Sequence, residues 1–372
     1  MTQHAPFRYD IVGSYLRPDT LKKARQEHEE GKLDYEGLRR IEDEAIVDLI
    51  KKQVDAGLKS ITDGEFRRSW WHLDFFWGLK GVEKVLGDGG YQFHDKVTRA
   101  ETARLNGKVS GENHPFVDDY KFLKANTPEG VEARQTIPAP AQFIAELERP
   151  ENIELTTKYY SNFDDLVEDI ATAYAQVAKD LYDAGLRTLQ IDDCTWGMLA
   201  GKQSGVAIPN GTVIEENEAA KALYVKANNA FIAKLPKDLV VTTHVCRGNY
   251  NSSWASKGAY DSVATPLFDE ENVSAYYLEY DTDRSGGFEP LAKVTPGKKV
   301  VLGLVTSKNG TLENREDIIA RIKEASRYVP LEDLYLSTQC GFASTEEGNI
   351  LTEDDQWAKI ALVKSIAEEV WS

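Results

Sequence analysis

Two cysteines and one histidine stand at the ends of β-like runs in this sequence. His244 and Cys246 end the run VVTTHVC at residues 240–246, and Cys340 ends LYLSTQC at residues 334–340. Residues two apart in a strand point to the same side, so His244 and Cys246 can converge on one point beyond the strand. An imidazole and two thiolates form a ligand set that zinc prefers. The spacing therefore indicates a zinc site.

A glutamate joins this set, whereas the third cysteine of the chain does not. Glu279 lies at the end of the β-like run at 275–280, and carboxylates are also zinc ligands. A single Cys or His at a strand end is usually a packing residue, so it is the coincidence of four residues that favours a metal. We interpret Cys194, which follows Asp192-Asp193, as a small buried hydrophobic residue or a loop residue. The predicted ligands are His244, Cys246, Glu279 and Cys340.

Two further carboxylates end other β-like runs. Glu65 closes SITDGE at 60–65, and Asp192 lies in TLQIDD at 188–193. Both are compatible with structural salt bridges. Carboxylates at one rim of a pocket can equally hold the ammonium group of an amino-acid substrate. The residues alone leave both interpretations open.

The runs that carry these residues belong to a repeated pattern of a short strand followed by a longer helical segment, which is typical of parallel α/β folds. Eight such strands are the number that closes a barrel, and active sites of these barrels lie at the carboxyl ends of the strands. We therefore expect one (β/α)8 TIM barrel that spans residues 1–372. The predicted strands cover 10–14, 60–65, 133–139, 188–193, 240–246, 275–280, 300–305 and 334–340.

The segment at 66–130 does not fit a simple strand–helix unit. It begins with the aromatic stretch RRSWWHLDFFWGLKG and continues as a polar, turn-rich sequence. Long insertions in compact domains are usually functional. We expect an insertion after the second strand that forms a hairpin or a lid over one face of the barrel.

Composition excludes several classes of protein. The formal net charge of −17 opposes nonspecific binding to nucleic acid, which depends on clusters of Lys and Arg. The sequence contains no run of 18 apolar residues and no basic N-terminal region followed by an apolar stretch, so we expect no membrane span, no secretion signal and a cytoplasmic location. Three cysteines do not form a disulfide framework, and a reducing compartment keeps such thiols free.

Six motifs together resemble the cobalamin-independent methionine synthase family, and in particular its short members. The resemblance covers nearly the whole chain in the family's order and matches the C-terminal catalytic barrel of the longer members. Its most specific part is the His-x-Cys, Glu, Cys set. The motifs are VGS at 12–14, DGEFRR at 63–68, QIDD at 190–193, HVC at 244–246, LEYD at 278–281 and QCGF at 339–342.

The resemblance implies a zinc-dependent methyltransferase that moves a methyl group to the thiol of homocysteine and forms methionine. It implies Zn²⁺ on the four ligands named above. A free thiol has a pKa of about 8.5, and coordination to zinc deprotonates it. The 372 residues accommodate only the catalytic barrel of the longer members. The resemblance therefore leaves the donor open between a methyltetrahydrofolate-type compound and another methyl donor. The implied homocysteine site consists of Gly13 and Ser14 for the carboxylate end and Glu65 and Asp192 for the amino group.

Other classes of function compete with this interpretation. A zinc hydrolase on a barrel activates water, but such sites usually favour His and carboxylate ligands over two thiolates. A noncatalytic protein that binds zinc or a thiol amino acid is compatible with the same residues. A related barrel family that decarboxylates porphyrins needs no zinc and leaves the Cys, His and Glu set unexplained.

Overall fold

A curled sheet of parallel strands forms the centre of the computed structural model, which describes residues 3–201 and 214–372. Seven strands pair in the order β1-β11-β10-β9-β8-β7-β6, and each pair is parallel. Apolar β-branched runs such as VVLGLV suit strands that are buried on both faces. The strands are β1 (Tyr9–Asp10), β6 (Gln135–Pro138), β7 (Thr188–Asp192), β8 (Val240–Val245), β9 (Ala275–Glu279), β10 (Lys299–Val305) and β11 (Leu334–Thr338).

Shorter pairings lie between the two edge strands of this sheet. β2 (Ser60–Ile61) pairs in parallel with β5 (Glu132–Ala133), which is separated from β6 by one residue. A parallel bridge joins Ser14, just beyond β1, to Gly64, just beyond β2. The expected parallel α/β fold is therefore confirmed, although the first two strands are shorter than the sequence predicted.

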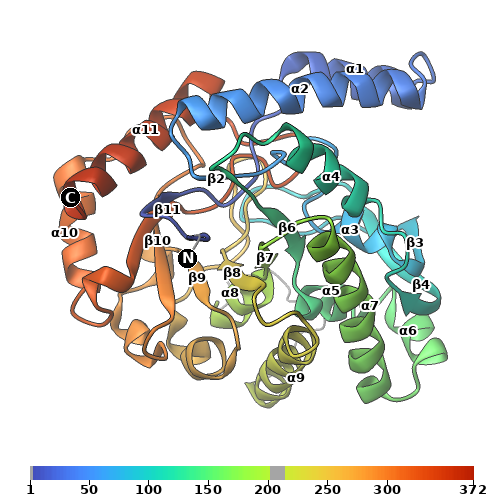
Figure 1. Cartoon of the computed structure of the whole chain (residues 1–372). Helices are drawn as coiled ribbons and strands as arrows, with labels where there is room; N and C mark the ends of the chain where they lie inside the picture. The colour runs from blue at the N-terminus through green and yellow to red at the C-terminus, as the bar shows by residue number, and fades with distance from the viewer. Residues whose placement is uncertain (1–2, 202–213) are drawn as a thin grey trace.

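Helices cover the outside of the sheet (Figure 1). Side chains cap the N-termini of several of them. Asn162 caps α7 by accepting a hydrogen bond from the Asp164 N–H, and Thr352 and Asp355 form a capping box at α11. The helices are α1 (Asp19–Glu29), α2 (Tyr35–Asp55), α3 (Leu73–Gly78), α4 (Phe116–Asn126), α5 (Pro140–Leu147), α6 (Ile153–Tyr159), α7 (Phe163–Asp183), α8 (Cys194–Ala200), α9 (Ile214–Ile232), α10 (Arg315–Ala325) and α11 (Glu353–Val370).

Single-turn helices occupy several of the loops. They are Tyr260–Val263, Thr265–Glu270, Asp283–Ser285, Glu289–Lys293 and Leu331–Asp333. The third of them follows β9 and carries Arg284, which contacts the predicted site residue Glu279.

The interior of the curled sheet contains a buried ion pair. The Arg134 guanidinium lies 3.3 Å from Asp10 and donates a 2.8 Å hydrogen bond to the Tyr277 hydroxyl. The Tyr277 hydroxyl in turn donates to Asp10 at 2.9 Å. Buried charges are tolerated when they are paired in this way, so the network ties β1, β9 and the residue between β5 and β6 together.

The segment at 66–130 contains an antiparallel pair of strands flanked by two helices. β3 (Lys80–Leu86) pairs with β4 (Glu101–Ser110), between α3 and α4. The pair lies at the edge of the molecule beside α6 and α7 (Figure 1). A hairpin is therefore present in the segment predicted as an insertion.

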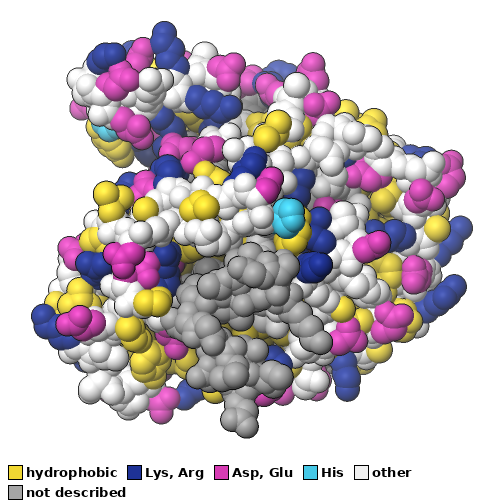
Figure 2. Space-filling view, turned by 180° about the vertical axis from the view of Figure 1, so that it is seen from behind, with side chains coloured by type: hydrophobic (Ala, Val, Ile, Leu, Met, Phe, Trp, Pro, Cys, Tyr) yellow, Lys and Arg dark blue, Asp and Glu magenta, His cyan; other side chains and the backbone are white. Residues whose placement is uncertain are grey.

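The described surface carries charges of both signs. On the face in Figure 2, Lys and Arg side chains are interspersed with Asp and Glu side chains rather than gathered in one patch. Within residues 3–201 and 214–372, no helix combines the length and apolar character that a membrane span requires.

Candidate active site

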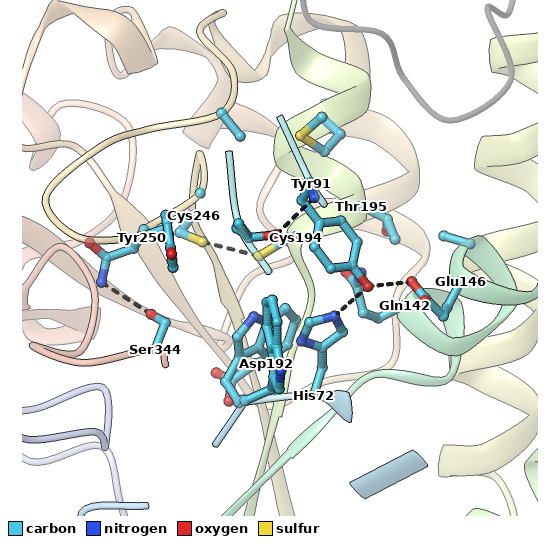
Figure 3. A pocket seen from close by; sticks show the side chains of 18 of the residues that line it. His72, Tyr91, Gln142, Glu146, Asp192, Cys194, Thr195, Cys246, Tyr250 and Ser344 are labelled. Atoms are coloured by element: carbon cyan, nitrogen blue, oxygen red, sulfur yellow. Dashed lines mark hydrogen bonds between the residues drawn. The ribbon is translucent and has the colours of Figure 1, made fainter. Parts of the chain in front are cut away.

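A cavity of about 330 Å³ lies at the carboxyl ends of the central strands. Its walls come from the ends of β7 and β8, the loop after β11, helices α5 and α8, and the segment at 66–130 (Figure 3). Strand ends of parallel α/β folds are the usual place for ligand sites. The predicted site residues that line the cavity are Ser14, Glu65, Asp192, His244, Cys246 and Cys340.

Three of these residues form a compact group of metal-ligating atoms. His244 and Cys246 lie at the end of β8, and Cys340 lies two residues after β11. One ring nitrogen and the two sulfur atoms all lie within 4.8 Å of one another, and the three side chains are buried. This combination of soft and borderline donors suits zinc.

The orientation of His244 is fixed by a carboxylate. Its Nδ1 lies 3.1 Å from Asp192 Oδ1, and the Gln190 side chain donates to the same oxygen at 2.8 Å. When Nδ1 donates its hydrogen to Asp192, Nε2 retains the lone pair that a metal needs. Asp192 therefore positions the imidazole as well as lining the cavity.

The ionisable groups of this cluster perturb one another. Burial lowers the pKa of His244, but Cys340 and Asp192 raise it more strongly, to about 10. The neighbouring Cys246 thiol and burial raise the pKa of Cys340 well above its usual range. Without a cation, two adjacent thiolates repel each other, so the thiols keep their protons. Coordination to a metal ion deprotonates both thiols. The donor set therefore fits a bound zinc ion.

Glu279 does not belong to the compact group. Its carboxylate is buried at the end of β9, where it accepts a 2.8 Å hydrogen bond from the Arg247 N–H and a 3.0 Å hydrogen bond from the Arg284 guanidinium. Burial raises the pKa of Glu279, but Lys308, Arg284 and Arg247 outweigh burial and keep it below its usual value. The structure thus holds Glu279 as a charge-paired carboxylate outside the His244, Cys246 and Cys340 group.

Cys194 lies beside the group, although the sequence analysis assigned it only a packing role or a loop position. Its sulfur is 3.2 Å from the Cys246 sulfur, and its side chain is partly exposed to the cavity (Figure 3). Cys194 follows two strand-end aspartates, so the strand-end rule applied to the other cysteines would have identified it as well.

Glu65 and Asp192 face the same cavity from different strands. Glu65 Oε1 accepts hydrogen bonds from Thr136 at 2.8 Å and pairs with Arg68 at 3.2 Å, while Oε2 is buried without a protein partner among the described residues. Burial raises the pKa of Glu65, Arg68 opposes this, and Asp192 adds to it. A buried carboxylate oxygen without a partner is costly, which favours a ligand that donates a hydrogen bond to it.

The chain around Ser14 packs closely against the loop after β11. The Phe342 N–H donates to the Ser14 carbonyl at 2.9 Å. A Cβ atom at Gly341 would lie 1.9 Å from Ser14 Oγ, so only glycine fits there. Gly13 has a φ of 147° and lies beside Thr136, and it is not among the cavity-lining residues. Ser14 lines the cavity and Gly13 shapes the backbone behind it.

The segment at 66–130 and α5 supply one wall of the cavity, where side chains form a chain of hydrogen bonds. His72 Nε2 lies 3.1 Å from the Tyr91 hydroxyl, which donates to Glu146 Oε2 at 2.7 Å (Figure 3). Arg149 lies over the Tyr91 ring at 4.5 Å. Burial and the charge of Arg149 lower the pKa of His72 to about 3, so the imidazole is neutral. These residues were not predicted from the sequence, because no periodicity in the insertion indicates which side chains face inward.

Comparison with known proteins places this geometry in a family. Residues 160–356 match the family described as "Cobalamin-independent synthase, Catalytic domain". The chain is 44% identical to "Uncharacterized protein YxjG" of Bacillus subtilis (strain 168), over 98% of this chain and 95% of that protein. It is 26% identical to a "Methionine synthase" of Saccharolobus solfataricus, over 89% of this chain and 86% of that protein.

A solved structure agrees with these sequence relatives. It is described as a putative vitamin-B12 independent methionine synthase from Listeria monocytogenes, with 36% identity and a TM-score of 0.74 over 100% of this chain and 99% of that chain. The resemblance inferred from the six sequence motifs is therefore confirmed. The chain belongs to the cobalamin-independent synthase catalytic-domain family.

Proposed function

We propose that this protein is a zinc-dependent methyltransferase that moves a methyl group from a donor to the thiol of homocysteine and so forms methionine. The observation that carries the proposal is the position of the His244, Cys246 and Cys340 group in one cavity with Glu65 and Asp192. The names of the S. solfataricus relative and the L. monocytogenes structure support the same activity.

The residues divide into two functional halves. His244, Cys246 and Cys340 would hold the zinc ion, which lowers the pKa of a coordinated substrate thiol and makes it a nucleophile at neutral pH. Glu65 and Asp192 would hold the substrate ammonium through charge-assisted hydrogen bonds, for which the free Oε2 of Glu65 is available. Ser14, with the backbone at Gly13, would bind the carboxylate end. Anchoring both ends of the amino acid orients its sulfur toward the donor methyl group.

The insertion would complete the cavity on the donor side. Its aromatic and polar wall, which includes His72 and Tyr91, faces the strand-end residues across the cavity. A closed wall excludes water from the reacting sulfur. In the same proposal, the eight strand segments and the Ser14–Gly64 bridge form one (β/α)8 barrel over residues 1–372, with this insertion after the second strand.

The test is the zinc content of purified protein, followed by methionine formation from homocysteine with methyltetrahydrofolate and other methyl donors assayed in parallel. The proposal expects one zinc per chain and methionine with at least one donor. Tight homocysteine binding without methionine from any donor would instead indicate a noncatalytic binding protein. Hydrolytic activity that does not require a thiol substrate would instead indicate a metal hydrolase.

A further inference from the structure

We propose that residues 92–97 form a strap at the cavity that opens to admit an amino acid and closes over it. The strap is the tip of the hairpin between β3 and β4. Its contacts with the rest of the chain do not involve the proposed zinc ligands. The inference therefore rests on the proposed function only for the identity of the ligand.

The strap forms an outer wall of the cavity. Gln92 and Phe93 line the cavity, and Gln92 is at the same time exposed to solvent. Glu65 and Asp192, which are proposed to hold the substrate ammonium, line the same cavity and are buried. On this side, a ligand that reaches the two carboxylates is separated from solvent by the thickness of the strap alone.

The strap closes against the loop at 250–254, which follows β8. Both hydrogen bonds and ring contacts join the two segments. They are the His94 N–H to the Trp254 carbonyl at 2.8 Å, the Lys96 ammonium to the Asn251 carbonyl at 2.6 Å, the Ser253 hydroxyl to the Asp95 carboxylate, the Phe93 ring beside the Tyr250 ring, and the His94 ring stacked on the Trp254 ring. Since all of them connect the same two segments, they act together as one latch.

The latch can open at low cost, because its groups lie at the surface. Each residue of the strap is exposed or half-buried, and His94 and Asp95 are exposed. When such contacts break, water replaces the lost hydrogen-bond partners, so each bond adds only modest net stability. Segments with few buried apolar contacts and exposed hydrogen bonds are the ones that open locally in a folded protein.

The base of the strap is fixed, in contrast to its tip. The Thr98 N–H donates to the Tyr91 carbonyl at 3.0 Å, and the Tyr91 N–H donates to the Thr98 hydroxyl at 2.8 Å. The Tyr91 hydroxyl is held by Glu146 at 2.7 Å (Figure 3). Within the strap, the Phe93 N–H donates to the Lys96 carbonyl at 2.8 Å. The strap therefore moves as one unit that pivots on Tyr91 and Thr98.

Such a movement serves the proposed reaction at two stages. The closed strap keeps water away from the reacting sulfur, and the open strap lets the amino-acid product leave.

The first test uses Cys194, whose partly exposed side chain lines the cavity and so reports access to it. The protein is treated with a bulky maleimide, and modification of Cys194 is followed over time by mass spectrometry. The double variant Asp95→Ala/Lys96→Ala removes two contacts of the latch. We expect its Cys194 to react about 5- to 100-fold faster than in wild type, because the lost hydrogen bonds shift the strap toward its open state.

The matched control is Asp118→Ala/Lys121→Ala, which removes an exposed acid and base 2.9 Å apart on α4. We expect this variant to react at the wild-type rate. Equal rates in the latch variant, the control and wild type would overturn the proposal.

A second test needs no variant and measures hydrogen exchange of the wild-type protein with and without methionine. The His94 amide is bonded across the latch, whereas the Thr98 amide is bonded within the base. At a methionine concentration of 100 Kd we expect exchange of the His94 amide to slow by up to about 100-fold, because a ligand that binds the closed state opposes opening. The Thr98 amide should change much less.

The two tests separate failure of the strap from failure of the proposed function. Unchanged exchange of the His94 amide, although calorimetry shows that methionine binds, would overturn the strap. If methionine did not bind at all, the proposed function would fail, and the Cys194 modification rates would still decide whether the strap opens.

Discussion

At the scale of single residues, the site depends on a histidine whose direction is set by a carboxylate. Asp192 contacts His244 Nδ1, so Nε2 is the nitrogen that would bind the metal in the proposed site. We predict that Asp192→Asn weakens zinc affinity by about 10- to 100-fold, the usual effect of losing such a partner. Competition with a chromophoric chelator measures this. The control is Asp118→Asn, since the Asp118 side chain is 79% exposed and should leave affinity unchanged.

A pH dependence follows from the environment of Glu65. Burial raises the pKa of this carboxyl above its usual value of about 4.3, with Asp192 adding to the effect and Arg68 opposing it. Because only the ionised form attracts an ammonium group, binding of methionine should tighten as the pH rises through this raised pKa. Methionine is a suitable probe because its thioether does not titrate.

Calorimetric titration of methionine from acidic to neutral pH checks this prediction. In Glu65→Gln we expect weak binding at every pH and no tightening over that interval. An identical pH profile in wild type and Glu65→Gln would show that another group controls ammonium binding.

The closeness of His244, Cys246 and Cys340 could be predicted from sequence because it depends on local geometry. The two-residue spacing of His244 and Cys246 and the strand-end position of Cys340 place them at one rim in any parallel sheet. The place of Glu279 could not be predicted in this way. It depends on Arg284, which lies in a short helix after β9 whose path no periodicity indicates.

At the scale of elements, the contact between α8 and β8 brings Cys194 to the site. A Cβ atom at Gly197 would collide with the Cys246 carbonyl, a backbone atom that cannot move aside cheaply. We predict that Gly197→Ala lowers the free energy of unfolding by about 1–3 kcal/mol and weakens zinc binding. Denaturant unfolding and chelator competition measure the two effects.

Gly107→Ala is the matched control for this substitution. A Cβ atom there meets only the Gly81 Cα at 3.6 Å, an ordinary van der Waals contact. We expect its zinc affinity to equal that of wild type. If Gly197→Ala also left zinc affinity unchanged, the packing of α8 would not govern the position of Cys246.

The insertion can be tested through Tyr91, whose hydroxyl joins His72 to Glu146. Removing the hydroxyl leaves buried polar atoms without a partner, which costs about 1–3 kcal/mol. We therefore expect Tyr91→Phe to be destabilised by this amount in chemical denaturation. Tyr35→Phe is the control, since Tyr35 is 63% exposed. Equal stability of the two variants would mean that the hydrogen-bond chain contributes little.

The segment at 66–130 shows which features of an element could be predicted from sequence and which could not. The antiparallel pair of strands within it could be predicted, because the segment at 66–130 breaks the strand–helix pattern. The cavity wall could not be predicted. His72 precedes α3, Tyr91 lies between β3 and β4, and Glu146 lies on α5, so these residues meet only through tertiary packing.

At the scale of the whole molecule, the parallel sheet gathers residues from distant parts of the chain into one cavity. Among the residues that the structure describes, the hydrophobic core is almost entirely one connected cluster. We predict a single cooperative thermal transition in calorimetry. Zinc should raise the midpoint temperature of this transition. At a free zinc concentration of 100 Kd, the free energy of unfolding should increase by about 2.7 kcal/mol. Two separate transitions, or a midpoint independent of zinc, would contradict this view.

The parallel α/β architecture was predictable because strand and helix periodicities alternate along the chain. The short first and second strands were not, since their pairing is confined to a few residues such as the Ser14–Gly64 bridge. The length of a strand depends on its pairing with neighbouring strands rather than on its local sequence. Even so, His244, Cys246 and Cys340, which were predicted at strand ends, line one cavity.

The central claim is that the metal held by His244, Cys246 and Cys340 binds the substrate thiol directly. Zinc K-edge X-ray absorption of the zinc-loaded protein with selenohomocysteine tests it, because selenium scatters differently from the cysteine sulfurs. The account predicts a zinc–selenium contact that is present in wild type and lost, together with zinc, in Cys340→Ser. Selenohomocysteine that binds the wild-type protein without any zinc–selenium contact would contradict the account.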